Sequence, residues 1–426
     1  MSAEKATNMR KKVCALQSKL SYAAKQSLDR KFGALYDKLY REDVLWVSWE
    51  LVRANKGAPG VDEQDFEYIE REIGVERFLA ELREDLYTKR YRPLPVLRCW
   101  IDKPGKPDKR PLGIPVIRDR VAQMAVKLIL EPIFETNFLP CSHGFRPKLS
   151  CHTAIDQIRR AITFDGLTTV IDADIVGYFS NIRHDLLLRL VGRRISDNRV
   201  IRLLRAWLKA GVMEAGVYEA SGETGSPQGG VISPLLSNIY LHSFDKMFQQ
   251  SGIEGKLVRY ADDFVVLVKG NGRKVVSLIQ KMLERLSLQV HPEKTRITSA
   301  YRGFDFLSVH FRMRPVRGKG SRLKESCRLW PADKAMQRVK QKLRDTIGNR
   351  FGLKLEEIIK ELNPIIRGWN NYHTRIRAEQ KRFLRLNHYV NERIRIFLKR
   401  KYSDRSRAGW RVAGNLPTKL GLAQFG

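Results

Sequence analysis

The sequence lacks the long apolar runs that membrane-spanning and exported proteins carry. No stretch of about 18 or more apolar residues occurs, so we expect no transmembrane helix. Residues 1–12 are polar and contain no apolar core of a signal peptide. The sequence also contains no internal repeat and no low-complexity tract. These absences favour a cytoplasmic protein of the bacterial cytosol or nucleoid.

Cysteine is scarce as well. The five cysteines are widely scattered, at Cys14, Cys99, Cys141, Cys151 and Cys327. None belongs to a C-x-x-C pair, which argues against a zinc ribbon and against a dithiol redox motif. We therefore expect buried, reduced thiols.

Acidic residues are few compared with basic ones. The 46 Asp and Glu face 79 Lys and Arg, which gives a formal net charge of +33. Such an excess creates a positive field that attracts polyanions. Nucleic acid is the obvious polyanion, and an anionic membrane surface is the alternative, although no basic amphipathic anchor is evident. The length of 426 residues predicts two or three domains.

The most informative motif is Tyr260-Ala261-Asp262-Asp263, which lies between two apolar, β-branched runs. Such flanks predict a β-hairpin with the two carboxylates at its turn. The apolar segment 170–175 supplies a third carboxylate, from either Asp172 or Asp174, and spacing alone leaves both open. Three converging carboxylates would suit two divalent cations about 3.5–4 Å apart, the arrangement for phosphoryl transfer. For an isolated Asp-Asp pair, an ordinary turn would be the simpler interpretation.

The last quarter of the chain differs in character. Strand patterns end with the segment Phe304 to Met313, and helical periodicity dominates from Pro331 to about Tyr402. Between Pro331 and Val412 there are 22 Lys and Arg against 8 Asp and Glu. We expect a separate helical domain with a basic face.

Together with these features, several longer blocks resemble the group II intron-type reverse transcriptases with a maturase region. The blocks, in the family's order, are Gly57 to Asp62, Arg110 to Pro115, Gly144 to Pro147, Asp174 to Phe179, Thr224 to Leu236, Tyr260 to Asp263, and Arg367 to Tyr372. The resemblance extends from about residue 50 to 400, and the blocks follow one another in the same order as in the family.

The resemblance implies an α+β fold, the right-hand polymerase with fingers, a palm with an antiparallel sheet, and a helical thumb. The implied division is a helical N-terminal extension (1–55), fingers (56–165), palm with finger-linked helices (166–315), helical thumb or maturase domain (325–402), and a basic C-terminal tail (403–426).

The resemblance also implies the site. Asp174, Asp262 and Asp263, helped by the backbone carbonyl of Ile175, would hold two Mg²⁺ ions, with Mn²⁺ as a substitute. Asp174 is preferred to Asp172 because the family places an aromatic residue, here Phe179, five positions after its metal ligand.

The dNTP would be bound by Lys103, Arg110, Phe179 and Gln228, with Lys106 and Lys109 as competitors for the phosphate contacts. Lys294 would be a general acid for the departing pyrophosphate, or simply a surface lysine. The residues implied in binding RNA or duplex are Arg146, Arg367, Arg375, Arg377, Lys381 and Arg382.

The implied partners are an RNA template, a DNA or RNA primer, dNTPs and group II intron RNA, and no membrane. The sequence leaves the oligomeric state open. Two alternatives remain: a splicing maturase with secondary polymerase activity, and a domesticated reverse transcriptase in host defence or repair. Ser308 stands where the family usually has glycine, which affects the primer grip. The family's HNH nuclease with paired cysteines is not evident, so we expect no cleavage of a second DNA strand.

Overall fold

A computed structural model describes residues 2–102, 109–225, 229–317, 323–376, 380–402 and 417–426. The chain forms two compact units. The first comprises Met1–Ser150, Asp172–Phe264 and Arg273–Arg296, and the second comprises Cys151–Ile171, Val265–Gly272 and Ile297–Gly426.

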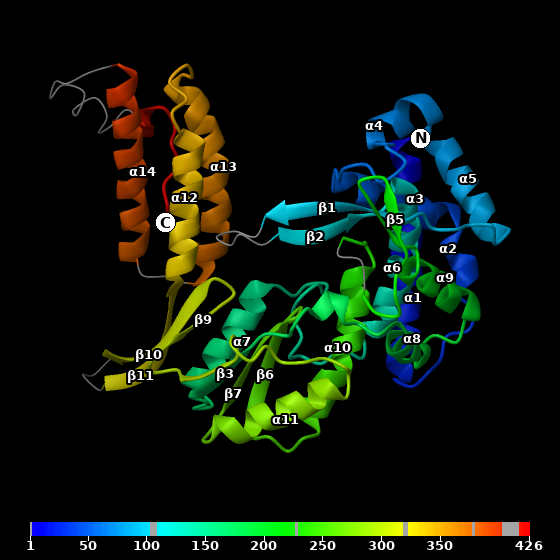
Figure 1. Ribbon diagram of the computed structural model, residues 1–426, viewed down its shortest axis with the longest axis horizontal. Helices are drawn as coiled ribbons and strands as arrows, with labels where there is room; N and C mark the ends of the chain where they lie inside the picture. The colour runs from blue at the N-terminus through cyan, green and yellow to red at the C-terminus, as the bar shows by residue number, and fades with distance from the viewer. Residues whose placement is uncertain (1, 103–108, 226–228, 318–322, 377–379, 403–416) are drawn as a thin grey trace. The chain divides into compact units, whose positions relative to one another are not determined.

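The first unit is mainly helical (Figure 1). Its helices are α1 (Ala3–Gln26), α2 (Tyr36–Leu39), α3 (Glu42–Ala54), α4 (Phe66–Tyr68), η1 (Ile69–Ile73), α5 (Val75–Tyr87), α6 (Ile117–Phe134), η2 (Tyr178–Ser180), α8 (His184–Gly192), α9 (Asn198–Leu208), α10 (Ser233–Gln249) and α11 (Gly272–Glu284). Helix α6 is buried along most of its length and packs against α1 and α3. Pro234 lies in the first turn of α10, where proline is favoured.

Strands β1 (Val96–Asp102), β2 (Lys109–Ile114), β4 (Val212–Glu214) and β5 (Val217–Glu219) form a sheet with the order β2-β1-β4-β5. β1 and β2 are antiparallel, with Trp100 opposite Pro111. A second sheet has the order β6-β7-β3-β8. Its strands are β6 (Gly255–Tyr260), β7 (Asp263–Val268), β3 (Thr169–Ala173) and β8 (Arg296–Ser299). The predicted strands on both sides of Ala261–Asp262 are thus neighbours, and the predicted strand at 170–175 lies beside them.

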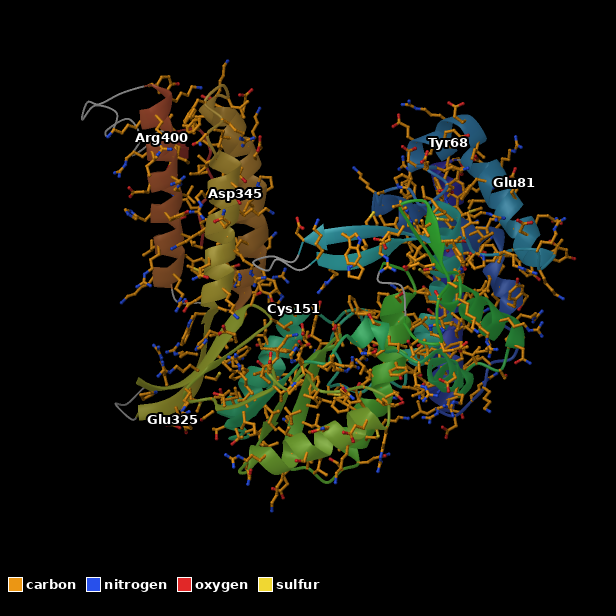
Figure 2. The ribbon with its side chains drawn as sticks, in the orientation of Figure 1. Tyr68, Glu81, Cys151, Glu325, Asp345 and Arg400 are labelled. Atoms are coloured by element: carbon orange, nitrogen blue, oxygen red, sulfur yellow. The ribbon has the colours of Figure 1, made fainter. Side chains whose placement is uncertain are left out.

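In the second unit, helix α7 (Cys151–Thr163) packs against a hairpin. The hairpin belongs to a sheet with the order β11-β10-β9, made of β9 (Phe304–Phe306), β10 (Val309–Arg317) and β11 (Leu323–Pro331). The strand predicted over Phe304–Met313 is interrupted, because Leu307 and Ser308 have left-handed φ angles of 47° and 63°. Figure 2 shows Glu325 on this hairpin.

Three long helices follow: α12 (Asp333–Ile347), α13 (Leu355–His373) and α14 (Gln380–Lys401), with the short η3 (Thr374–Ile376) before α14. They lie side by side around one apolar core (Figure 1). The helical character predicted after Pro331 is confirmed.

The end of the chain also packs against these helices. Leu422 and Phe425 are buried in the helical core. Asn363, Asn370 and Asn387 each exchange two hydrogen bonds with the backbone of residues 421–426, at 2.7–3.2 Å. The prediction of a basic tail over 403–426 is therefore wrong for residues 417–426, whose apolar side chains belong to the core.

Among the helices of the described residues, none has both the length and the apolar character needed to cross a lipid bilayer. The cysteines are free, but the expectation of buried thiols holds only for Cys327. Cys14 is exposed, and Cys99, Cys141 and Cys151 are partly exposed.

Candidate active site

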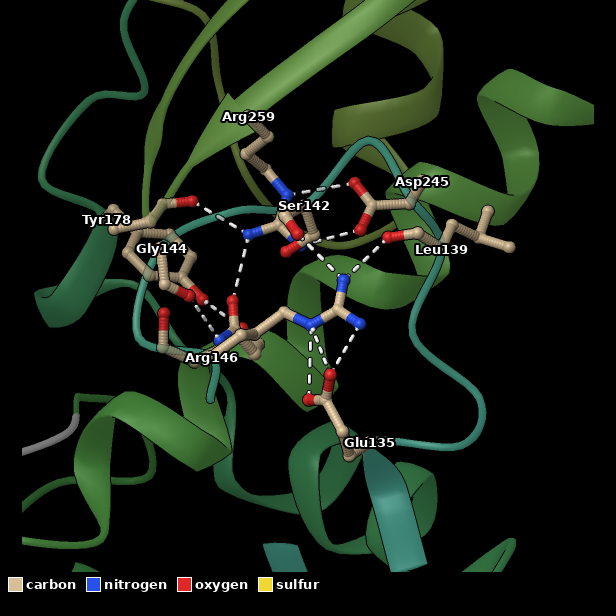
Figure 3. Close-up of polar contacts among 11 residues, drawn as sticks. Glu135, Leu139, Ser142, Gly144, Arg146, Tyr178, Asp245 and Arg259 are labelled. Carbon is tan, nitrogen blue, oxygen red and sulfur yellow. Dashed lines mark hydrogen bonds and ion pairs between the residues drawn. The ribbon is translucent and has the colours of Figure 1, made fainter. Parts of the chain in front are cut away.

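The turn between β6 and β7 is held by a buried arginine. Arg259, with no exposed side-chain surface, donates two hydrogen bonds to the carboxylate of Asp245, at 2.9 and 2.6 Å. It also donates to the carbonyl oxygen of Ala261 at 2.8 Å, and Ala261 has a left-handed φ of 58°. Burial lowers the pKa of Arg259, but attraction to Asp245 outweighs it, so the guanidinium stays charged. Figure 3 shows this network.

The segment around Gly144 supports the same turn. The backbone nitrogen of His143 donates to the carbonyl of Arg259, and that of Arg259 donates to Cys141, both at 2.8 Å. A Cβ at position 144 would lie 2.2 Å from the backbone nitrogen of Ala261, so only glycine fits there. The carbonyl of Gly144 accepts a hydrogen bond from Asn238 at 2.8 Å (Figure 3). The Gly144 block therefore fixes the backbone beneath the two turn carboxylates.

Asp174 follows directly after β3 and is held by its backbone. Its carbonyl oxygen accepts a hydrogen bond from His291 at 2.8 Å, and Ile175 forms an antiparallel bridge with Val290. The Asp174 side chain forms an ion pair with Lys294. Lys294 is thus in contact with Asp174, a candidate metal ligand.

The carboxylates influence one another electrostatically. Burial, then the neighbouring charges of Asp262, Asp174 and Asp172, raise the pKa of Asp263 to about 6. Burial and the Asp174 charge also raise the pKa of Asp262. Although the Asp263 side chain reaches solvent, the surrounding protein atoms and like charges disfavour its ionised form. Three carboxylates, two at the turn and one after β3, therefore lie within electrostatic range of one another. The charge of Asp174 raises the pKa of Asp263 more than the charge of Asp172 does.

In the described part of the chain, no three acidic, histidine or cysteine side chains are grouped tightly enough to form a ready-made metal cage. The donor set nevertheless fits a hard divalent cation, because it consists of carboxylate oxygens. Its excess negative charge, which raises the pKa of Asp263, is the charge that such a cation would compensate.

Of the residues predicted to bind the dNTP, Arg110 and Phe179 are described. The positive charge of Arg110, exposed on β2, lowers the pKa of both Asp262 and Asp263, so Arg110 lies within electrostatic range of both. Phe179 is partly exposed and lines a cleft of about 250 Å³ together with Gly113 and Gly225. Lys103, Gln228 and Arg377, the other residues predicted for phosphate, sugar and RNA contacts, lie outside the described residues, as does the competitor Lys106.

The comparisons with known proteins decide the family. A model described as reverse transcriptase (RNA-dependent DNA polymerase) matches residues 101–311, and the group II intron maturase-specific domain matches residues 336–413. Protein YkfC of Escherichia coli (strain K12) is 36% identical over 336 residues, which cover 69% of this chain and 87% of the relative. The group II intron-encoded protein LtrA of Lactococcus lactis subsp. cremoris is 31% identical over 372 residues, which cover 71% of this chain and 61% of LtrA.

The chain belongs to the group II intron family of reverse transcriptases. A third relative, a 91 kDa protein in the cob intron of Schizosaccharomyces pombe, is 27% identical over 413 residues, which cover 79% of this chain and 50% of the relative. The chain therefore spans about half to three fifths of the length of two of these relatives.

Two of the basic residues predicted to bind nucleic acid in this reverse transcriptase have structural partners instead. The buried Arg146 guanidinium forms an ion pair with Glu135 at 2.7 Å and donates to the carbonyls of Leu139 and Ser142 at 2.7 Å each (Figure 3). Arg382 donates to Asp333 at 2.7 Å. These contacts do not support the predicted duplex contacts, because the donors are used within the protein.

Among the described residues, the other side chains of the maturase region that are predicted to bind RNA are exposed. Arg367 lies on α13, Arg375 on η3 and Lys381 on α14. Figure 2 shows that Arg400, near the end of α14, and Asp345, near the end of α12, also carry side chains on the outside of these helices.

The side chains that support the β6–β7 turn in this reverse transcriptase are not evident from the sequence alone. Arg259 and Asp245 are charged residues inside otherwise apolar segments, a strand and a helix. Because buried charges need partners, a charged residue in an apolar segment indicates a buried ion pair. The sequence does not show which acid pairs with which base, because that depends on the tertiary fold.

Proposed function

We propose that this protein is an RNA-directed DNA polymerase that extends a primer on an RNA template by two-metal-ion nucleotidyl transfer. The observation that carries the proposal is that Asp262 and Asp263 at the β6–β7 turn and Asp174 after β3 lie within electrostatic range of one another. Burial, and then the charges of Asp262 and Asp174, raise the pKa of Asp263 to about 6. Membership of the reverse transcriptase family supports the same activity.

In this proposal, the carboxylates of Asp174, Asp262 and Asp263 hold two Mg²⁺ ions, for which Mn²⁺ can substitute, and the Ile175 carbonyl assists. When bound, such ions supply Lewis-acid activation of the attacking hydroxyl and neutralise charge on the leaving group. Arg259 keeps the turn carboxylates in place through the Ala261 carbonyl.

In this proposal, cationic side chains bind the incoming dNTP, and an aromatic side chain selects its sugar by steric exclusion. Arg110 neutralises charge on the triphosphate. The sequence adds Lys103 for the same role and Gln228 for a contact with the sugar. Phe179 excludes a ribose 2′-hydroxyl from the cleft that it lines. The Lys294 ammonium, held beside Asp174, donates a proton to the departing pyrophosphate.

We further propose a right-hand arrangement. Residues 56–165 form the fingers, 166–315 the palm and 325–402 the thumb, after a helical N-terminal extension over 1–55. The β6-β7-β3-β8 sheet and the helices α12, α13 and α14 support the palm and thumb assignments.

A primer-extension assay tests the polymerase proposal. Wild-type protein with Mg²⁺ should extend a primer on an RNA template with dNTPs and far more slowly with NTPs. An absence of extension with Mg²⁺ and with Mn²⁺, from protein that binds the template–primer, would overturn the proposal.

Replacing Phe179 should relax sugar selection. The Phe179→Ala protein should incorporate NTPs with a discrimination against ribose reduced by about 100-fold, the range in which a pocket filters one hydroxyl. Phe164→Ala is the matched control, because Phe164 is 75% exposed. Ratios of kcat/KM for dNTP and NTP measure the effect, and unchanged selection in Phe179→Ala would count against the filter.

We also propose that the helical domain binds group II intron RNA as a maturase. Two observations favour this second function: the match of residues 336–413 to the maturase-specific domain, and the exposure of Arg367, Arg375 and Lys381. A-form RNA is contacted mainly through its backbone and shape, which suits exposed cations.

This binding should weaken steeply with salt, because each phosphate contact releases counterions. Replacing Arg367, Arg375 and Lys381 by Ala should reduce the slope of log K against log salt by about 1 for each residue. Arg77→Ala is the control, because that exposed cation is already paired with Glu81 at 2.9 Å. A flat plot for the wild type, or an equal change in the control, would contradict the assignment.

A further inference from the structure

A pocket of about 440 Å³ lies between α12 and α13 of the helical domain. Its lining combines aromatic side chains from α13, among them Trp369 and Tyr372, with the cationic Arg338 and Lys342 from α12. The volume lies in the range of about 300–1,000 Å³ that small-molecule sites occupy. Neither the carboxylates at the β6–β7 turn nor the exposed cations of the helical domain account for it.

The pocket contains a buried polar group without a partner. His373 lines it, is only 3% exposed, and its Nδ1 has no hydrogen-bond partner among the described residues. Burial, then the nearby His152 and Arg338, lower the pKa of His373 to about 4, so the ring is neutral at pH 7. The indole nitrogen of Trp369 is likewise buried and unpartnered. Such groups need partners, and a ligand with hydrogen-bonding edges would supply them.

Ser308 orients one of the cations at this pocket. Its hydroxyl accepts a hydrogen bond from Arg338 Nη2 at 3.1 Å, and both residues line the pocket. Ser308 occupies a left-handed conformation, φ 63°, in which a non-glycine residue is strained. Serine therefore contributes something that glycine would not, and the contact with Arg338 is that contribution.

We propose that this pocket takes one unpaired nucleobase of a bound RNA strand. The base lies against the aromatic side chains, its edge pairs with His373 Nδ1, and Arg338 and Lys342 neutralise the adjoining phosphates. Unpaired RNA bases are commonly recognised in this way, by stacking on aromatic side chains and hydrogen bonding at their edges. An apolar peptide would use the aromatic surface but leave both cations without a counterpart.

The inference rests on the proposed binding of RNA by the helical domain and does not depend on the polymerase activity. Its test is a binding measurement. The probe is an RNA hairpin with one bulged 2-aminopurine, compared with the fully paired hairpin. Stacking of a base on aromatic side chains amounts to about 1–3 kcal/mol, so the bulged RNA should bind roughly 5- to 150-fold more tightly. The 2-aminopurine fluorescence should fall on binding.

Gly368→Leu should remove this preference. A Cβ at position 368 would meet no atom within 4 Å, and Gly368 lines the pocket, so the larger side chain occupies pocket space. Leucine also favours the α-helix over glycine, which protects the fold. The paired hairpin should bind as before, and the thermal midpoint should not fall. Gly368→Ala, with its smaller side chain, is a second variant in case leucine perturbs the helix.

Ser308→Gly should lower the preference by about 3- to 10-fold, because Arg338 loses its anchor while the backbone strain is relieved. Arg344→Ala, which removes a cation of α12 that does not line the pocket, is the charge control. Asp263→Asn, expected to be inactive in primer extension, should keep the bulge preference, which separates the two proposals. Equal affinity for bulged and paired RNA, or an unchanged preference and quenching in folded Gly368→Leu protein, would overturn the inference.

Discussion

Asp263→Asn should lower the rate of primer extension by more than about 100-fold. The reason is that residues which merely orient metal ligands already contribute 10- to 100-fold, and Asp263 is proposed to be a ligand itself. The substitution keeps the size of the side chain and removes its charge. Single-turnover extension with saturating dNTP and Mg²⁺ measures the chemical step.

The loss should not come from unfolding. The fold raises the pKa of Asp263 to about 6. Above that pH the carboxyl is ionised, and its charge destabilises the folded state relative to the unfolded one. Asparagine removes this unfavourable charge, and the thermal midpoint of the metal-free protein should stay the same or rise. Added Mg²⁺ should raise the midpoint of the wild type more than that of the variant, because a ligand stabilises the state that binds it.

The matched control is Asp172→Asn, which removes a carboxylate from the same region of the chain, on β3. Because Asp172 has the smaller influence on Asp263, we expect its replacement to retain most extension activity. Loss of activity in Asp172→Asn with full activity in Asp174→Asn would reverse the choice between these two residues. Full activity in Asp263→Asn would remove the basis of the two-metal proposal.

The sequence predicts those parts of the candidate site that depend only on neighbouring residues in the chain. Apolar, β-branched segments on both sides of Ala261 and Asp262 specify two strands and place the carboxylates at a turn, and the structure has β6 and β7 there. The helical pattern after Pro331 is equally local. In both cases the period of the apolar residues decides the element.

The sequence does not predict the role of a charged side chain when that role depends on whether the side chain is buried. Arg146 and Arg382 look like nucleic-acid contacts in a strongly basic chain, but their guanidinium groups bind Glu135 and Asp333. The last ten residues carry Leu422 and Phe425 into the helical core, although their segment follows a basic stretch. Ser308 lies in the two-residue turn between β9 and β10, where both residues have left-handed backbones. Such turns favour glycine, so the serine hides this turn from the sequence.

Asp245→Ala should be the most destabilising single change considered. It leaves the Arg259 guanidinium buried without its acid, and breaking a buried pair in this way costs about 3–5 kcal/mol. With about 2–4 °C per kcal/mol for a domain of this size, the thermal midpoint should fall by roughly 6–20 °C. Circular dichroism melting measures the shift, and Arg183→Ala is the control, because the Arg183–Asp185 pair is exposed at the surface.

The double variant Arg259→Met with Asp245→Leu separates stability from function. Replacing both charges by apolar side chains of similar size should recover most of the lost stability, because no uncompensated charge remains. Primer extension should stay low, however, because the donor to the Ala261 carbonyl is gone and the turn that carries Asp262 and Asp263 is no longer fixed. Recovery of both stability and activity would show that Arg259 serves only the fold. Recovery of neither would show that the packing around Ser142 and Asn238 also requires the charged pair.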